Sequence, residues 1–205
     1  MKRSFFANTM ILTLTTQLLS LIGVWFVAWL SGAIGAEGMG LYQLISSVYI
    51  LAGTLASSGV GVTVARLVAE SVAKSGGRST SDVLRKAVVL AAAMGLAVGG
   101  ALYLLAEPIG VQLLGDRRTV LSLRVLAPAL PFMALSACMR GYFIGIRRVL
   151  KPSSQMVFEQ LVRVAISMLI LRAFLPRGLE YACLAVILAC MISEAASCLY
   201  AFVMV

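Results

Sequence analysis

Long stretches without a single charged residue dominate this sequence and restrict its fold more than any motif does. Three of them cover residues 4–36, 38–65 and 87–106. Each reaches the ~20 residues that an apolar helix needs to cross the hydrocarbon core of a bilayer. Lipid offers the backbone no hydrogen-bond partners, so such a run is stable there as a helix. The sequence therefore predicts an integral membrane protein.

The composition excludes the main alternatives. Apolar residues make up 61% of the chain and charged residues only 12%, whereas a soluble domain carries about 25% charged residues. Strands of a membrane barrel alternate apolar with polar residues, and these runs do not. We predict an all-α, polytopic membrane helical bundle that forms one unit over residues 1–205. Its transmembrane helices, about six, are expected at residues 10–31, 41–66, 86–106, 121–146, 153–175 and 180–204.

The distribution of Lys and Arg favours a cytoplasmic N-terminus, because positive charges gather on the cytoplasmic side of membrane proteins. In that orientation the cytoplasmic segments hold Lys2, Arg3, Arg66, Lys74, Arg78, Arg85, Lys86, Arg147, Arg148 and Lys151. The opposite segments hold fewer, namely Arg117, Arg118, Arg124, Arg172 and Arg177. Both ends of the chain are then expected in the cytoplasm. The last apolar stretch has no closing polar flank, so we expect the protein to be a fragment of a longer one.

Several kinds of chemistry have no support in the sequence. The chain has no His, which removes His-based triads, general bases and metal sites. Its four cysteines lie in apolar stretches without CxxC spacing, a pattern typical of buried thiols: Cys138, Cys183, Cys190 and Cys198. No Gly-rich loop continues into the Lys-Ser/Thr of a phosphate-binding loop. We expect no enzymatic activity, no cofactor, no metal and no nucleic-acid partner.

The fifth predicted span carries the most informative polar residues. Gln155, Glu159, Arg163 and Ser167 are spaced by four and share one helix face. Glu159 and Arg163 can pair, which lowers the cost of burying either charge. This stripe should face protein or water rather than lipid. It forms either the wall of a polar cavity or a structural ion pair that holds two helices together.

The fourth predicted span combines prolines with arginines. Pro128 and Pro131 remove backbone donors and should kink the helix, as in the broken helices of transporters. Arg140 lies too deep for a residue that reaches the membrane surface from a helix end, which favours a role in a cavity. Arg124 lies closer to an interface and is expected to extend towards the headgroups.

Three further residues complete the candidate binding set: Arg66, Gln17 and Glu194. Arg66 can pair with Glu70 near the cytoplasmic boundary, either as an interfacial anchor or as a substrate contact. Gln17 is the strongly polar side chain of the first span. Glu194 in the sixth span either titrates as a coupling site or pairs with an arginine of another helix. In the second span, Gly59 and Gly61 should permit close approach of a neighbouring helix.

Two segments resemble a known family. Residues 35–70 and 140–164 are similar to stage V sporulation protein B and related polysaccharide-biosynthesis membrane proteins of the multidrug/oligosaccharidyl-lipid/polysaccharide exporter superfamily. The second segment is the more specific, and it matches the family pattern at Arg140, Gly141, Tyr142, Phe143, Gly145, Pro152, Gln155, Glu159, Gln160, Arg163 and Val164.

The resemblance implies a two-lobed exporter fold of which this chain would be the N-terminal lobe. Flippases of this superfamily move a lipid-linked saccharide by alternating access, with arginines on the diphosphate and the acyl tail in a side groove. The matched positions are Arg140, Glu159 and Arg163. The first span departs from the lipid II flippases, because it has Gln17 and no arginine. The substrate class is therefore expected to be an undecaprenyl diphosphate saccharide, with its identity open.

We interpret the chain as half of a flippase of the bacterial cytoplasmic membrane, acting in cell-envelope, polysaccharide or spore-wall synthesis. Its expected partners are the bilayer, the lipid-linked saccharide and a missing C-terminal lobe. The alternatives are a multidrug or cation exporter of the same superfamily, and a truncated membrane scaffold without transport activity. An excess of arginines over carboxylates among the buried charges favours an anionic substrate: Arg66, Arg124, Arg140 and Arg163 against Glu159 and Glu194.

Overall fold

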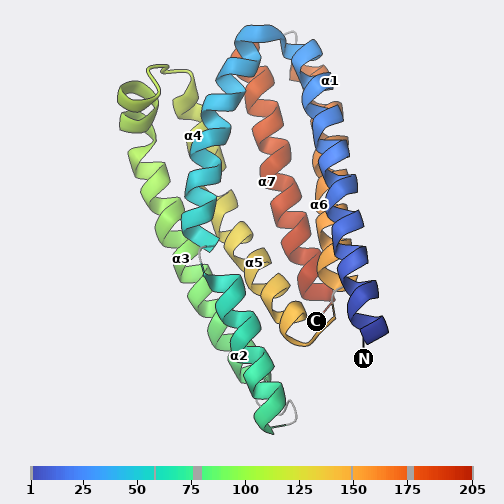
Figure 1. Cartoon of the computed structure of the whole chain (residues 1–205). Helices are drawn as coiled ribbons and strands as arrows, with labels where there is room; N and C mark the ends of the chain where they lie inside the picture. Colours follow the sequence, from blue (N-terminus) through green and yellow to red (C-terminus); the bar gives the residue numbers. More distant parts are fainter. Residues whose placement is uncertain (1, 58, 76–79, 149, 175–177, 205) are drawn as a thin grey trace.

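A computed structural model describes residues 2–57, 59–75, 80–148, 150–174 and 178–204, which form a bundle of helices (Figure 1). Arg78 and Arg177, which contributed to the charge bias, lie outside these ranges. The helices are α1 (Lys2–Ser57), α2 (Val60–Ser75), α3 (Thr80–Pro108), η1 (Ile109–Leu113), α4 (Thr119–Leu126), α5 (Ala129–Gly145), α6 (Leu150–Phe174) and α7 (Leu179–Val203). The predicted all-α fold is confirmed for the described residues.

Helix α1 consists of two helical halves that meet at Gly35. This residue has φ 70° and ψ −176°, a conformation that a side chain would strain. Figure 1 shows the bend at the top of the molecule, from which the second half runs back down. The predicted span 10–31 therefore lies in the first half of α1, and the predicted span 41–66 begins in the second half. A turn at Gly35 joins the two halves.

The second predicted span is interrupted where the sequence pattern is continuous. The prediction for residues 41–66 was one helix, but α1 ends at Ser57 and α2 begins at Val60. Between them Gly59 has φ +71°, with nothing within 4 Å of where its Cβ would lie. Gly59 thus breaks the helix and makes no close contact, and only Gly61 approaches another helix as expected. Helix α2 then continues in the same direction to Ser75.

The fourth predicted span, 121–146, is bent at its prolines. Helices α4 and α5 meet at an angle of 42°. Pro128 stands at this junction as the residue before α5, where its missing N–H takes one backbone hydrogen bond out of the helix. The predicted kink is confirmed.

Length and composition identify membrane-crossing segments in the described helices. Met10–Ala73, Thr80–Leu113 and Glu180–Val203 each qualify, and the bent pair α4–α5 could form a further span. The first of these is interrupted at Gly35 and would measure about 96 Å if straight, so it is long enough to cross a ~30 Å hydrocarbon core twice. Helix α6, which carries Lys151, Glu159, Arg163 and Arg172, is not among these segments.

Close helix packing holds the bundle together. Where α2 crosses α5, a Cβ added to Gly141 would lie 2.3 Å from the carbonyl oxygen of Gly61. Helices α6 and α7 form the most extensive pair, and α5 contacts α2, α3 and α7. The start of α1 and the end of α7 lie at the same end of the bundle as the C-terminal ends of α2 and α5 (Figure 1). This end is the predicted cytoplasmic side.

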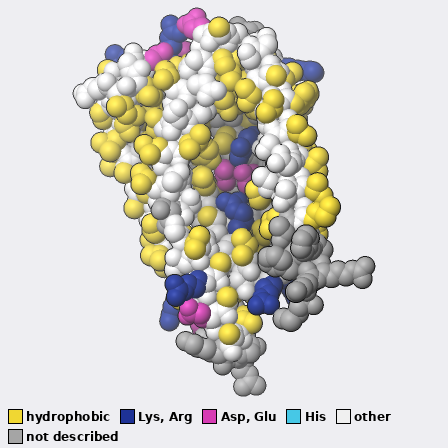
Figure 2. Space-filling model, in the orientation of Figure 1, with side chains coloured by type: hydrophobic (Ala, Val, Ile, Leu, Met, Phe, Trp, Pro, Cys, Tyr) yellow, Lys and Arg dark blue, Asp and Glu magenta, His cyan; other side chains and the backbone are white. Residues whose placement is uncertain are grey.

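The outer surface is strongly apolar. Val62, Leu104, Leu169 and Val203 are each more than 70% exposed. Figure 2 shows hydrophobic side chains over the middle of the molecule, with charged groups near its two ends. Such a large exposed apolar surface is unfavourable in water and is stable against lipid tails. The chain is a membrane protein.

Candidate functional site

Four charged side chains from three helices meet inside the bundle, and we call them the charge cluster. Arg163 of α6 contacts Glu159 of the same helix (Nη2–Oε1 2.8 Å) and Glu194 of α7 (Nη2–Oε1 3.5 Å). Arg140 of α5 contacts the second carboxylate oxygen of Glu159 (Nη1–Oε2 3.7 Å). Helix α5, which carries Arg140 and begins after Pro128, contacts α2, α3, α6 and α7.

The stripe on α6 points into the protein. Gln155 and Ser167 are completely buried, and Glu159 and Arg163 between them are partly buried. The spacing of four residues places all of them on one face, which packs against α7. The expectation that this stripe avoids lipid is confirmed, as is the pairing of Glu159 with Arg163.

Helix α7 presents serine hydroxyl groups to this stripe. Gln155 Nε2 donates to Ser197 Oγ (3.1 Å), and Ser197 Oγ donates to Glu159 Oε2 (3.0 Å). Arg163 Nε donates to Ser193 Oγ (3.4 Å). The sequence interpretation missed both serines, although their spacing of four residues beside Glu194 was a readable signal. These hydroxyl groups replace hydrogen bonds to water that the charged groups lose when they are buried.

Tyr49 of the second half of α1 also belongs to the site and was missed. Its hydroxyl donates to Glu194 Oε1 (2.9 Å). Glu194 therefore has two partners from different helices, Tyr49 and Arg163, and the contact with an arginine of another helix was one of the two predicted alternatives. The available signal was a tyrosine within an apolar span, since a buried Tyr hydroxyl usually finds a hydrogen-bond partner.

Access to the cluster differs among its members. The side chains of Arg140 and Arg163 are each 27% exposed, Glu159 is 16% exposed and Glu194 only 5%. Figure 2 shows charged side chains of both signs in a recess near the middle of one face. A cavity of about 170 Å³, lined among others by Tyr42, Tyr49 and Cys190, also reaches Arg163. The arginines are thus the accessible part of a mostly buried network.

The cluster is charge-balanced, which corrects one expectation. From the sequence, we expected more arginines than carboxylates among the buried charges. Among the described residues the structure joins Arg140 and Arg163 with Glu159 and Glu194, so that the two positive charges face two negative ones. Net charge alone therefore no longer favours an anionic over a cationic ligand.

Three of the candidate residues lie apart from the cluster. Arg66 pairs with Glu70, as predicted, but its side chain is 82% exposed. Arg124 contacts Glu107 (3.6 Å) and lies over the ring of Tyr103, which fits a residue that extends towards an interface. The remaining one, Gln17, is exposed on the first half of α1. The structure does not bring Arg66, Arg124 or Gln17 to the charge cluster.

A second ionic group joins three segments at the opposite end of the bundle from the termini. Arg118, just before α4, contacts Glu37 after the Gly35 turn (2.9 Å) and Glu180 at the start of α7 (3.3 Å). Hydrogen bonding by Glu37 and the charge of nearby Asp116 raise the pKa of Arg118 above its ordinary value. Arg118 therefore stays cationic and links these three segments.

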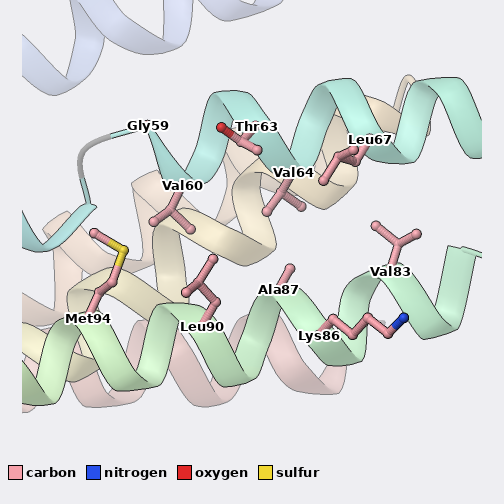
Figure 3. A pocket seen from close by; sticks show the side chains of 10 residues that line it. All are labelled: Gly59, Val60, Thr63, Val64, Leu67, Val83, Lys86, Ala87, Leu90 and Met94. Atoms are coloured by element: carbon pink, nitrogen blue, oxygen red, sulfur yellow. The ribbon is translucent and has the colours of Figure 1, made fainter.

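An apolar recess near the predicted cytoplasmic end lies between α2 and α3. Its volume is about 360 Å³, and it is lined by Gly59, Val60, Thr63, Val64, Leu67, Val83, Lys86, Ala87, Leu90 and Met94. Figure 3 shows the apolar side chains of α2 and α3 facing each other, with Lys86 near the loop end of the recess. We call this recess the α2–α3 groove. Its inner wall is close to the crossing of Gly61 with Gly141, the residue after Arg140.

The cysteines form no bonds with one another. Cys138, Cys183 and Cys198 are buried, Cys190 is partly buried, and all four are free thiols. The prediction of buried or nearly buried thiols in apolar surroundings is confirmed.

Comparison with known proteins gives a consistent picture. A family model described as polysaccharide biosynthesis protein matches residues 5–205. Stage V sporulation protein B of Bacillus subtilis (strain 168) is 32% identical over 203 residues, which cover 98% of this chain and 39% of that protein. The chain thus spans well under half the length of this relative. No solved structure matches the chain.

Proposed function

Since the chain belongs to the polysaccharide biosynthesis protein family, we propose that it is one lobe of a flippase that moves a lipid-linked saccharide across the membrane. The membrane is the bacterial cytoplasmic membrane, and the N-terminus lies in the cytoplasm. A second, C-terminal lobe completes the transporter and alternates access with this one. Similarity to a sporulation protein over 39% of its length supports both the missing lobe and a role in envelope or spore-wall synthesis.

The proposed binding site for the substrate's diphosphate is the pair Arg140 and Arg163. Both guanidinium groups lie in the membrane-spanning part of the bundle, where an arginine is costly and usually functional. Each is 27% exposed, so that a ligand can reach it. A guanidinium group binds phosphate oxygens with two parallel hydrogen bonds, and two such groups suit a diphosphate.

The α2–α3 groove offers a surface for the apolar isoprenoid tail. It is lined almost entirely by aliphatic side chains of α2 and α3 (Figure 3). Burying a hydrocarbon chain there stabilises the complex in proportion to the apolar area covered, with lipid tails as competitors. Contact between α2 and α5 at Gly61 and Gly141 connects this groove with the helix that carries Arg140.

One observation carries the proposal: the family match coincides with two partly exposed arginines of different helices that both contact Glu159. Binding of a fluorescent undecaprenyl diphosphate saccharide to the full-length protein in nanodiscs tests it. Arg140→Lys and Arg163→Lys should weaken binding, since Lys keeps the charge and loses the planar fork, and Ala at both positions should abolish it. Equal binding by the double Ala variant and the parent would contradict the diphosphate site.

Because the cluster contains two carboxylates as well as two arginines, export of an organic cation or drug is a second candidate function. Glu159 and Glu194 could bind a cation once the contacts with Arg163 are broken. The same nanodisc preparation distinguishes the two functions. A cation exporter should bind ethidium or a similar organic cation, and the Glu159→Gln variant should lose that binding. The proposed flippase should bind the diphosphate probe instead.

A further inference from the structure

Glu159 makes contacts that an anionic ligand of this site would also make. Its Oε1 accepts from Arg163 of α6 at 2.8 Å, and its Oε2 lies 3.7 Å from Arg140 of α5. One carboxylate therefore bridges two guanidinium groups from different helices. A bridging phosphate group would need the same two partners.

The second carboxylate of the cluster is held differently. Glu194 contacts Arg163 at 3.5 Å and accepts from Tyr49, and no contact joins it to Arg140 among the described residues. Its side chain is only 5% exposed, compared with 16% for Glu159. Glu194 can thus keep Arg163 in position when Glu159 is absent, whereas Arg140 would then be left without an ionic partner.

From these contacts we propose that Glu159 is an internal competitor of the substrate. In the empty protein it occupies the bridging position between Arg140 and Arg163, and the phosphate groups of the substrate displace it. This inference rests on the proposed function, because it assumes that the two arginines bind the diphosphate.

The displaced carboxylate has donors within reach. Ser197 Oγ already donates to Glu159 Oε2 at 3.0 Å. Gln155, which lies one helical turn before Glu159, donates through Nε2 to the same Ser197 Oγ at 3.1 Å. Turning towards these two groups would keep Glu159 hydrogen-bonded after it leaves the arginines, which lowers the cost of displacement. A charged substrate could then bind a site that carries no net charge when empty.

Displacement would also link binding to helix position. In the empty protein Glu159 ties α5 to α6, because Arg140 and Glu159 belong to different helices. When the substrate binds both arginines, the direct contact between Arg140 and Glu159 is replaced by a contact of both helices with the ligand. Release of the substrate allows Glu159 to contact the arginines again. Arg140 is therefore never left without a negative partner, which would be costly in a membrane.

The test is the change in affinity for the diphosphate probe when the competitor is removed from the full-length protein in nanodiscs. Glu159→Gln keeps the size of the side chain and loses its charge. The affinity of this variant for the probe should therefore be at least about tenfold higher than that of the parent. A simple ligand role for Glu159 predicts the opposite, a loss of affinity. Glu107→Gln is the matched control, because Glu107 pairs with exposed Arg124 away from the cluster and should leave the affinity unchanged.

A second variant and a second readout protect the test against loss of stability. Glu159→Leu also removes the competitor and should tighten binding in the same direction. For both variants, saturating probe should raise the melting temperature more than it does for the parent, since stabilisation grows with affinity. Unchanged or weaker binding by both variants, while the Arg140→Ala and Arg163→Ala variants lose the probe, would overturn the competitor role. If the arginine variants bind as well as the parent, the proposed diphosphate site itself fails.

Discussion

The hydroxyl of Tyr49 lies 2.9 Å from Oε1 of Glu194, so that a tyrosine of the second helical half of α1 holds the most buried acid of α7. The two residues are 145 positions apart in the sequence. Through Glu194 and Arg163, this hydrogen bond connects α1 to the cluster formed by α5, α6 and α7. It is the contact that extends the charge network across the bundle.

Replacing Tyr49 by Phe should destabilise the protein by about 0.6–2 kcal/mol, the range for a hydrogen bond within a membrane or to a charged group. Unfolding by denaturant in detergent measures the loss. Tyr103→Phe is the control, because Tyr103 is 53% exposed and its ring, which faces Arg124, is retained. Equal stability of the Tyr49→Phe variant and the parent would show that the bond contributes nothing.

Removing Arg163 should be far more damaging. Arg163→Met leaves Glu159 and Glu194 facing each other without their shared cation, at a cost of about 3–5 kcal/mol. Adding Glu159→Leu and Glu194→Leu should restore much of the stability, since Arg140, 27% exposed, is then the one charge of the cluster that remains, while diphosphate binding stays lost. Arg66→Met, which breaks an exposed ion pair, should leave the unfolding free energy almost unchanged.

A single methyl group at the crossing of α2 and α5 should disturb the bundle. In Gly141→Ala the new Cβ would lie 2.3 Å from the carbonyl oxygen of Gly61, so one helix must move, at a cost of about 1–3 kcal/mol. Gly100→Ala on α3 meets nothing within 4 Å and should be neutral or slightly stabilising. If both variants unfold alike, the close crossing is absent in the membrane.

The orientation can be tested by labelling single cysteines in a variant without the four native ones. A cysteine at position 116 should react with an impermeant maleimide added to intact cells, because the connection before α4 lies at the end predicted to be outside. A cysteine at position 148, in the connection between α5 and α6, should react only after the cells are opened. The reverse pattern would invert the proposed topology.

Groove variants should separate tail binding from head binding. Replacing Leu67 and Leu90 together by Asn removes apolar surface from the α2–α3 groove, so affinity for a long-chain undecaprenyl diphosphate should fall about tenfold. Affinity for a short-chain farnesyl diphosphate should change little. The control pair, Leu104→Asn with Leu169→Asn, is still more exposed and does not line the groove, so it should not discriminate by chain length.

Much of the local structure could be predicted from the sequence because a membrane leaves the backbone little choice. The charge-free runs predict helices, the prolines predict the bend between α4 and α5, and the spacing of Gln155, Glu159, Arg163 and Ser167 predicts a face turned away from lipid. These features depend on residues close together in the chain. The Gly59 break was missed because glycine is tolerated in a membrane helix, and a pattern of apolar residues does not reveal a positive φ.

The partners of each charge were decided by the tertiary structure alone. The sequence placed Arg66, Arg124, Arg140 and Arg163 in or near the spans without distinguishing them, and folding brought only the last two to Glu159 and Glu194. Tyr49 joined them from a helix more than a hundred residues away. The reason is physical: helix formation in lipid is dictated by local backbone hydrogen bonding. The pairing of buried charges depends instead on how the helices pack, since a guanidinium and a carboxylate attract strongly only within a few ångströms.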